Sequence, residues 1–145
     1  MKYSIQHQFH IAANKNTVYD ALTTINGLRN WWTILTDGDP KINGELQFNF
    51  GDYIGPKMKV TALVPNESVE WVCVDSKHGW QNHTFSFKLD IAEGKTAISF
   101  IHNGWDEQGE FYAHCNFSWG RYLESLRQYC QTGNGESHGS QGYRK

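Results

Sequence analysis

A chain of 145 residues is long enough for one domain with a substantial core, and no change in composition before Gly133 marks a second domain. Its 13 Lys and Arg stand against 15 Asp and Glu, for a net charge of -2, and the cations are scattered singly, so we expect no nucleic acid partner. The first residues alternate polar and apolar without a continuous apolar run, which predicts no secretory signal, no membrane association and a cytoplasmic location.

The cysteines and histidines show no spacing typical of a metal site. The 3 cysteines are widely spaced within apolar patterns, and we expect reduced core thiols at Cys73, Cys115 and Cys130. His7 and His10 should face opposite sides of a strand. His114 and Cys115 are neighbours that diverge on a helix. The glycines lack the spacing that cradles phosphate before a helix, so we expect neither a metal nor another cofactor.

The N-terminal part predicts one strand and two short helices. Residues 3–11 alternate strictly, as a half-buried strand does, with one face formed by Ile5, His7, Phe9 and Ile11. Asn14 can cap a short helix whose apolar stripe is Val18, Ala21, Leu22 and Ile25. A second short helical piece carries Leu28, Trp31 and Trp32.

From Ile42 to about Gly104 the apolar residues recur with a period of two, between turn signals at 51–56, 65–66, 77–79 and 93–94. Five strands joined by hairpins are expected, in an antiparallel sheet with one dry face. Parity predicts the inward set as Leu46, Phe48, Phe50, Met58, Val60, Ala62, Val69, Trp71, Cys73, His83, Phe85, Phe87, Leu89, Ile91, Ile98, Phe100 and His102.

The longest segment with helical period runs from Glu110 to Gln131, and Gly133 supplies a stop signal. Its apolar stripe consists of Cys115, Trp119, Tyr122, Leu126 and Tyr129. These elements predict an α+β fold in which a curved six-stranded antiparallel sheet wraps around a long C-terminal helix, with two short helices after the first strand. We expect a single domain over residues 1–133 and a disordered polar tail over residues 134–145.

Several segments in this order resemble the SRPBCC (START-like, helix-grip) superfamily, and within it the homologues of the activator of heat-shock protein ATPase. They are Val18–Thr23, Leu28–Trp32, Gly44–Phe48, Val69–Trp71, Trp119–Leu126 and Thr132–Gly135. The resemblance covers roughly residues 3–135. It implies a helix-grip fold with a deep cavity between sheet and helix, which members use to hold lipids, sterols, polyketides or other hydrophobic molecules. The superfamily has no universal catalytic motif, so no catalytic residue is carried over.

We therefore expect this protein to bind a small hydrophobic molecule, flat or acyl, in that cavity. The residues expected to line it are Trp32, Phe48, Phe50, Met58, Trp71, His83, Phe85, Phe87, Phe100, His102, Cys115, Ser118, Trp119 and Tyr122. Affinity would come from apolar burial, with His83 or His102 orienting a ligand oxygen. The other reading of these histidines is a structural one, with a hydrogen-bond partner in the core or at its rim. Further rings at Tyr53, Trp80 and Tyr112 would form either a lid over the cavity or a surface patch for another protein.

Two other functions are left open. The same cavity would serve a cyclase- or hydrolase-type enzyme using His102 and His114. The family resemblance also implies a co-chaperone-like interaction module with a chaperone partner. We expect a monomer or a weak dimer.

Overall fold

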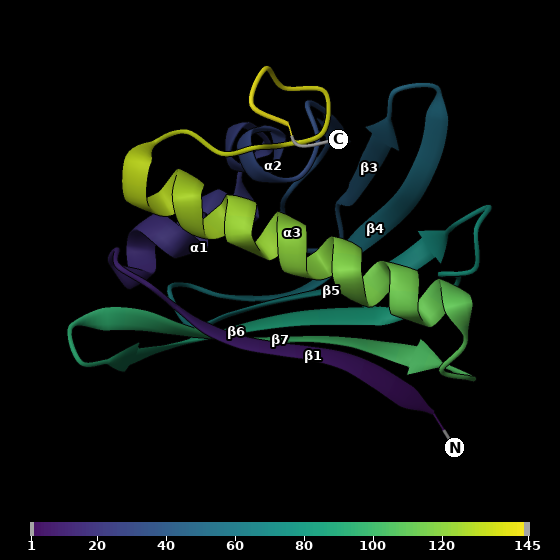
Figure 1. Ribbon diagram of the computed structural model, residues 1–145, viewed down its shortest axis with the longest axis horizontal. Helices are drawn as coiled ribbons and strands as arrows, with labels where there is room; N and C mark the ends of the chain where they lie inside the picture. Colours follow the sequence, from purple (N-terminus) through teal and green to yellow (C-terminus); the bar gives the residue numbers. More distant parts are fainter. Residues whose placement is uncertain (1, 144–145) are drawn as a thin grey trace.

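Residues 2–143 are described by a computed structural model, which has one seven-stranded antiparallel sheet and a long C-terminal helix (Figure 1). The elements follow in the order β1 (Tyr3–Ile11), α1 (Lys15–Thr23), α2 (Ile25–Trp31), β2 (Leu35–Gly38), β3 (Glu45–Phe50), β4 (Tyr53–Val64), β5 (Ser68–Asp75), β6 (Thr84–Ala92), β7 (Lys95–Trp105) and α3 (Glu110–Thr132). The α+β class, the two short helices after the first strand and the long helix are confirmed.

The sheet has one strand more than the sequence predicted. Its order is β1-β7-β6-β5-β4-β3-β2, a meander from β2 to β7 with β1 added beside β7. The additional strand, β2, is a four-residue edge strand. Its inward residue is Thr36, which is fully buried and donates a hydrogen bond to the carbonyl of Thr33 at 2.8 Å. Because that residue is polar, β2 lacks the apolar alternation by which the other strands were recognised.

Thr24 separates the two short helices. Its backbone is extended, and its side-chain oxygen accepts a hydrogen bond from the amide of Gly27 at 3.0 Å while donating one to the carbonyl of Asp20 at 2.8 Å. The residue therefore closes α1 and caps α2. A side chain at Gly27 would come within 2.9 Å of three backbone atoms of Ala21, so the close packing of the two helices requires glycine here.

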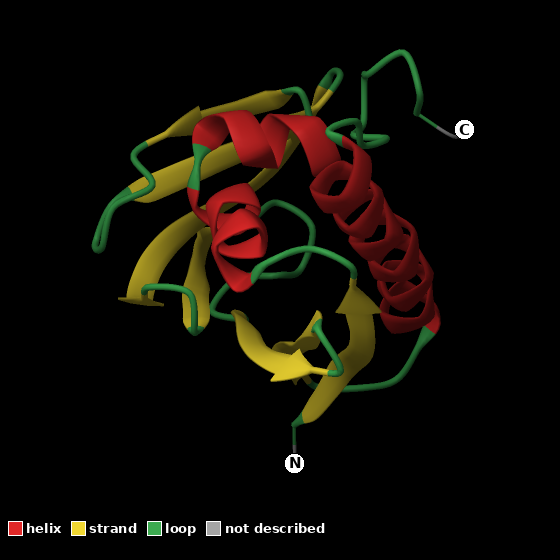
Figure 2. Cartoon of the chain, turned by 90° about the vertical axis from the view of Figure 1, so that its left-hand side faces the viewer, coloured by secondary structure: helices red, strands yellow, loops and turns green. Residues whose placement is uncertain are grey.

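The long helix α3 lies against β1 and ends at Gly133, whose φ is +86°. The hydroxyl of Tyr112 donates to the carbonyl of Ser4 at 2.7 Å, and the amide of Ala12 donates to Gln131 at 2.8 Å. These bonds join the helix to the edge strand at both of its ends. Figure 2 shows the sheet curving around the helices, with α3 along the open side.

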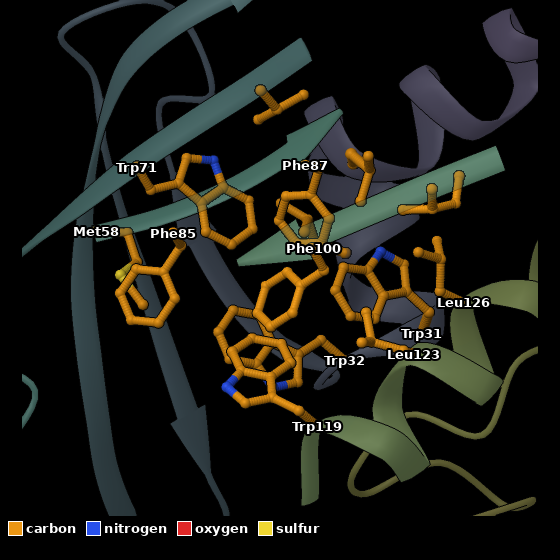
Figure 3. Packing of buried hydrophobic residues seen from close by; sticks show 14 of the residues in the cluster. Trp31, Trp32, Met58, Trp71, Phe85, Phe87, Phe100, Trp119, Leu123 and Leu126 are labelled. Carbon is orange, nitrogen blue, oxygen red and sulfur yellow. The ribbon is translucent and has the colours of Figure 1, made fainter. Parts of the chain in front are cut away.

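The inner face of the sheet is covered by closely packed rings (Figure 3). Ring centroids are 4.2 Å apart for Trp32 and Phe48 and 4.5 Å apart for Phe100 and Trp119. Trp31, from α2, donates its indole N–H to the carbonyl of Ala21 at 2.9 Å. Most of the space between sheet and helix is therefore solid core, and a cavity opens only where this packing ends.

The segment after Gly133, predicted to be a disordered tail, is described as far as Tyr143 and packs on the domain beside α2 (Figure 1). The amide of His138 donates to the carbonyl of Trp32 at 2.8 Å, and the carbonyl of His138 accepts from Ile34 at 3.1 Å. Ser125, on α3, accepts a hydrogen bond from the amide of Glu136 at 2.7 Å. Residues 134–143 thus lie against the domain through backbone and side-chain hydrogen bonds that composition does not reveal.

Candidate functional site

A cavity of about 290 Å³ opens between the N-terminal half of α3 and the turn that joins β3 to β4. We call it the aromatic pocket. The β5–β6 loop and the C-terminal segment complete its wall. It is lined by Trp32, Phe50, Tyr53, Gly55, Pro56, Ser76, His78, Trp80, Phe111, His114, Cys115, Ser118, Trp119, Arg121, Tyr122, His138 and Tyr143. The volume is near the lower end of the range of small-molecule sites, about 300–1,000 Å³.

Indole rings form the inner wall of the pocket. Trp80 stacks on Trp119 with ring centroids 5.9 Å apart and planes 10° apart, and the ring centroid of Trp32 lies 5.1 Å from that of Trp119. Trp32 and Trp119 are only 2 % exposed, so core packing fixes the inner end of this wall. Rigid aromatic faces of this kind suit the stacking of a flat apolar ligand.

A second band of rings follows the outer rim. His78 stacks on Tyr53 with ring centroids 4.1 Å apart. Tyr53 in turn packs edge-on against Phe50, with ring centroids 6.3 Å apart. Phe50 meets His138 edge-on at 5.4 Å, and His138 lies 4.8 Å from the ring of Tyr143. Three separate parts of the chain thus meet along one rim.

The predicted lining residues fall into three groups. Those that line the aromatic pocket are Trp32, Phe50, Cys115, Ser118, Trp119 and Tyr122. A second group points inward as predicted but is at most 1 % exposed within the core: Phe48, Met58, Trp71, Phe85, Phe87 and Phe100. Other side chains cover these residues, and the pocket does not reach them.

The third group is the histidine pair. His83 Nδ1 lies 2.9 Å from His102 Nε2, and the indole N–H of Trp119 donates to His102 Nδ1 at 3.1 Å. Because an indole can only donate, Nδ1 of His102 must accept, and its proton sits on Nε2 and is donated to His83. Neither imidazole lines the pocket. The structural reading of both histidines fits this geometry, with each ring bonded to the other.

Burial keeps this pair neutral. Desolvation, and to a lesser extent the neighbouring His83, together lower the pKa of His102 to about 2. Desolvation also lowers the pKa of His83. Neutral rings fit the hydrogen-bond direction deduced above, in which His102 accepts from Trp119 and donates to His83.

Several pocket residues were not predicted from the sequence: His78, Phe111, His138 and Tyr143. Of the rings expected as a lid or patch, Tyr53 and Trp80 do line the pocket. The hydroxyl of Tyr112 instead donates a hydrogen bond to the carbonyl of Ser4 in β1. His78 lies in the turn that follows β5. The sequence signal for a close approach here was Gly79 in the same turn, whose φ is +103° and whose Cβ, if present, would lie 3.2 Å from the ring of Phe111.

The buried thiols of the pocket wall and the core are not activated as nucleophiles. Burial raises the pKa of Cys115 in the pocket wall to about 11, and that of Cys73 in the core also to about 11. Such thiols stay protonated and are poor nucleophiles. Within residues 2–143, no three side chains of His, Cys, Asp or Glu are grouped so that they could hold a metal ion.

A larger groove of about 490 Å³ runs over the outer side of α3. Its described lining includes Asn116, Glu124 and Glu136 and contains no tryptophan, whereas Trp32, Trp80 and Trp119 line the aromatic pocket. Because stacked indoles offer a flat ligand broad apolar faces, we take the aromatic pocket as the candidate site.

The family model for the Activator of Hsp90 ATPase homolog 1-like proteins matches residues 12–131. The chain belongs to this family. The matched residues include all of α1 to β7 and nearly all of α3. The helices and strands that line most of the aromatic pocket therefore belong to the part of the chain that the Activator of Hsp90 ATPase homolog 1-like family shares. The C-terminal segment that supplies His138 and Tyr143 lies beyond the matched range.

Solved structures agree with this assignment. The solution structure of the Aha1 dimer from Colwellia psychrerythraea is 35% identical in sequence to this chain and superposes on it with a TM-score of 0.84. The match covers 92% of this chain and 99% of the Colwellia chain. CalU16 of Micromonospora echinospora (17% identity, 90% and 67% of the two chains, TM-score 0.75) has the same fold. So does DynU16, from the dynemicin biosynthetic locus (14% identity, 91% and 48%, TM-score 0.70). No protein of curated function matches the chain. None of the helices in residues 2–143 is long and apolar enough to cross a membrane.

Proposed function

We propose that this protein binds a small, flat, aromatic molecule in the aromatic pocket. The observation that carries the proposal is the arrangement of two bands of rings, Trp80, Trp119 and Trp32 inside and His78, Tyr53 and Phe50 at the rim, around a cavity of about 290 Å³. Burial of flat apolar surface between them would supply about 25 cal/mol per Å² before the costs of association.

The size of the pocket narrows the class of ligand expected from the sequence. A sterol or a long acyl chain needs a deep cavity along the helix, and here that space is occupied by Phe48, Phe87, Phe100 and their neighbours. A ligand of one or two fused rings suits the remaining volume.

The test is a titration of ¹⁵N-labelled protein with 2-naphthamide, a neutral bicyclic probe, followed by amide chemical shifts and tryptophan fluorescence. We expect saturable shifts concentrated at the segments that line the pocket, which are residue 32 and residues 50–56, 76–80, 111–122 and 138–143, and a change in indole emission. Shifts that are absent or do not saturate, both with this probe and with its carboxylate analogue 2-naphthoate, would contradict the proposal. Native mass spectrometry of freshly purified protein would report a retained ligand and would also test the proposal of a monomer or weak dimer.

Catalysis receives less support from the geometry. His102 is fully buried and has both ring nitrogens within hydrogen-bond distance of His83 and Trp119, so it cannot reach a substrate in this conformation. His114 does line the pocket and is the remaining candidate for proton transfer.

Family membership favours a second candidate, an interaction with an Hsp90-type chaperone. Its test is the ATPase rate of the chaperone with and without the purified protein. A rate unchanged at saturating protein would dispose of this candidate and leave ligand binding untouched.

A further inference from the structure

The lining of the aromatic pocket is rich in nitrogen bases, whereas Glu124 and Glu136 line the outer groove, which shares Arg121 and Tyr143 with it. Its lining includes imidazoles from three elements: His78 in the β5–β6 loop, His114 on α3 and His138 in the C-terminal segment. Arg121 also lines it and lies 5.6 Å from the ring centre of Tyr143. Among the described residues, no aspartate or glutamate contributes to the wall. The described lining thus carries basic side chains and no carboxylate.

From this arrangement we infer that the ligand of the aromatic pocket is a planar aromatic anion, a carboxylate or phenolate whose ring stacks on the indoles and whose charge lies among His78, His114, His138 and Arg121. The inference rests on the proposed function and specifies its ligand. An anion would find cationic and N–H donor groups at the rim, where a neutral ligand would gain only ring contact.

Histidine is the side-chain type whose charge changes near neutral pH, and His138 is the pocket histidine whose pKa is lowered by burial. The other titratable side chains that line the pocket are Tyr53, Cys115, Arg121, Tyr122 and Tyr143. Burial raises the pKa of Tyr53 and of Tyr122, and it raises that of Cys115 to about 11, so these three stay neutral. Arginine stays charged at all relevant pH.

An anion held beside an imidazole favours its protonated form, and by linkage the protonated pocket binds the anion more tightly. Burial lowers the pKa of His138, so this ring is largely neutral at pH 7 without a ligand and has a proton to gain when an anion binds. A rise of one pKa unit in one imidazole corresponds to about tenfold in affinity between its two forms.

The experiment compares 2-naphthoate with 2-naphthamide at pH 6 and pH 8 in low salt, using the same tryptophan fluorescence titration. We expect naphthoate to bind about tenfold more tightly than the amide at pH 6, and this ratio to fall at pH 8. The variant pair His78→Gln and His138→Gln, combined in one protein, should bring the ratio at pH 6 towards one. His10→Gln, on the exposed side of β1 and away from the pocket, is the matched control and should leave the ratio as it is.

A ratio at or below one at pH 6, or a ratio that does not change between pH 6 and pH 8, overturns the inference while saturable binding of the amide leaves the proposed function standing. If neither probe binds, the proposed function itself fails. The two failures are therefore separate results of one titration series.

Discussion

The Nδ1 atom of His83 lies 2.9 Å from the Nε2 atom of His102, and the far nitrogen of His102 accepts a hydrogen bond from Trp119. One end of this chain of bonds is an indole that forms the pocket wall, and the other is a ring at the start of β6. The geometry requires both imidazoles to be neutral and places His102 where no solvent reaches it.

The first prediction is that stability falls as the pH drops below about 6.5. The folded pKa of His102, about 2, is below its unfolded value, so the unfolded chain takes up the proton first as the solution is acidified. The contribution of this residue is complete above pH 6.5 and decreases by about 1.4 kcal/mol per pH unit below it. His83 acts in the same direction. Urea unfolding between pH 7.5 and pH 4.5 measures the slope.

His102→Gln is the control for that slope. A glutamine amide can accept from Trp119 and donate to His83, but it does not titrate. Below pH 6.5 the variant should therefore lose stability less steeply than the native protein, by about 1.4 kcal/mol per pH unit. Equal slopes in the two proteins would show that His102 is not protonated on unfolding.

The second prediction concerns the coupling of His102 to Trp119. His102→Leu removes the partner of a buried indole N–H and of His83, which costs about 1–3 kcal/mol for each group left unpaired. Trp119→Phe loses packing but removes the N–H as well. In the double variant that donor is no longer left unpaired, so the loss should be smaller than the sum of the single losses, with a coupling of about 0.5–3 kcal/mol. Additive losses would argue against the bond.

Strand parity correctly predicted which residues point inward where helices pack on the sheet. It failed where no helix covers the sheet and where the register between two strands changes. Ile91 has the inward parity of Phe85 and Phe87, yet it is 69% exposed because β6 extends past the helices towards its hairpin with β7 (Figure 1). Ala62 follows an irregularity in the pairing of β4 with β5, and Leu63 packs on the core in its place. Parity alone carries no information about either effect.

The candidate site was only partly predictable for a related reason. Periodicity shows that Phe48 and Phe100 point inward, but whether an inward ring faces a cavity depends on what packs on it from elsewhere in the chain. Here Trp32 and Trp119 cover those two rings. The contributions of His138 and Tyr143 were missed because a Gly-rich polar composition predicts disorder, and the hydrogen bonds that hold the segment involve distant backbone atoms.

The third prediction is that Gly135→Ala detaches the C-terminal segment. A Cβ atom there would lie 2.3 Å from the carbonyl oxygen of Asn30, which is backbone and cannot rotate away. The segment should lift, the amide of His138 should lose protection against hydrogen exchange, and stability should fall by about 1–3 kcal/mol. Gly142→Ala is the matched control, because its Cβ would meet nothing closer than 3.7 Å. Unchanged protection at His138 in Gly135→Ala would refute the role of this contact.

The fourth prediction is that Ser118→Trp fills the aromatic pocket. Ser118 lies one helical turn before Tyr122 and lines the cavity, so an indole at this position would occupy the space proposed for the ligand. We expect the affinity for 2-naphthamide to fall at least about tenfold, since a ligand must then displace a packed ring. The protein should remain folded because the added side chain enters an open cavity.

Phe117→Trp is the control for this change on the neighbouring residue of α3. Phe117 is 67% exposed and does not line the aromatic pocket, so the same indole added there should leave the affinity for 2-naphthamide unaltered. Circular dichroism of both variants checks that the fold is retained. Full affinity in folded Ser118→Trp would mean that the probe binds elsewhere, and the outer groove along α3 would then be the surface to examine by chemical shifts.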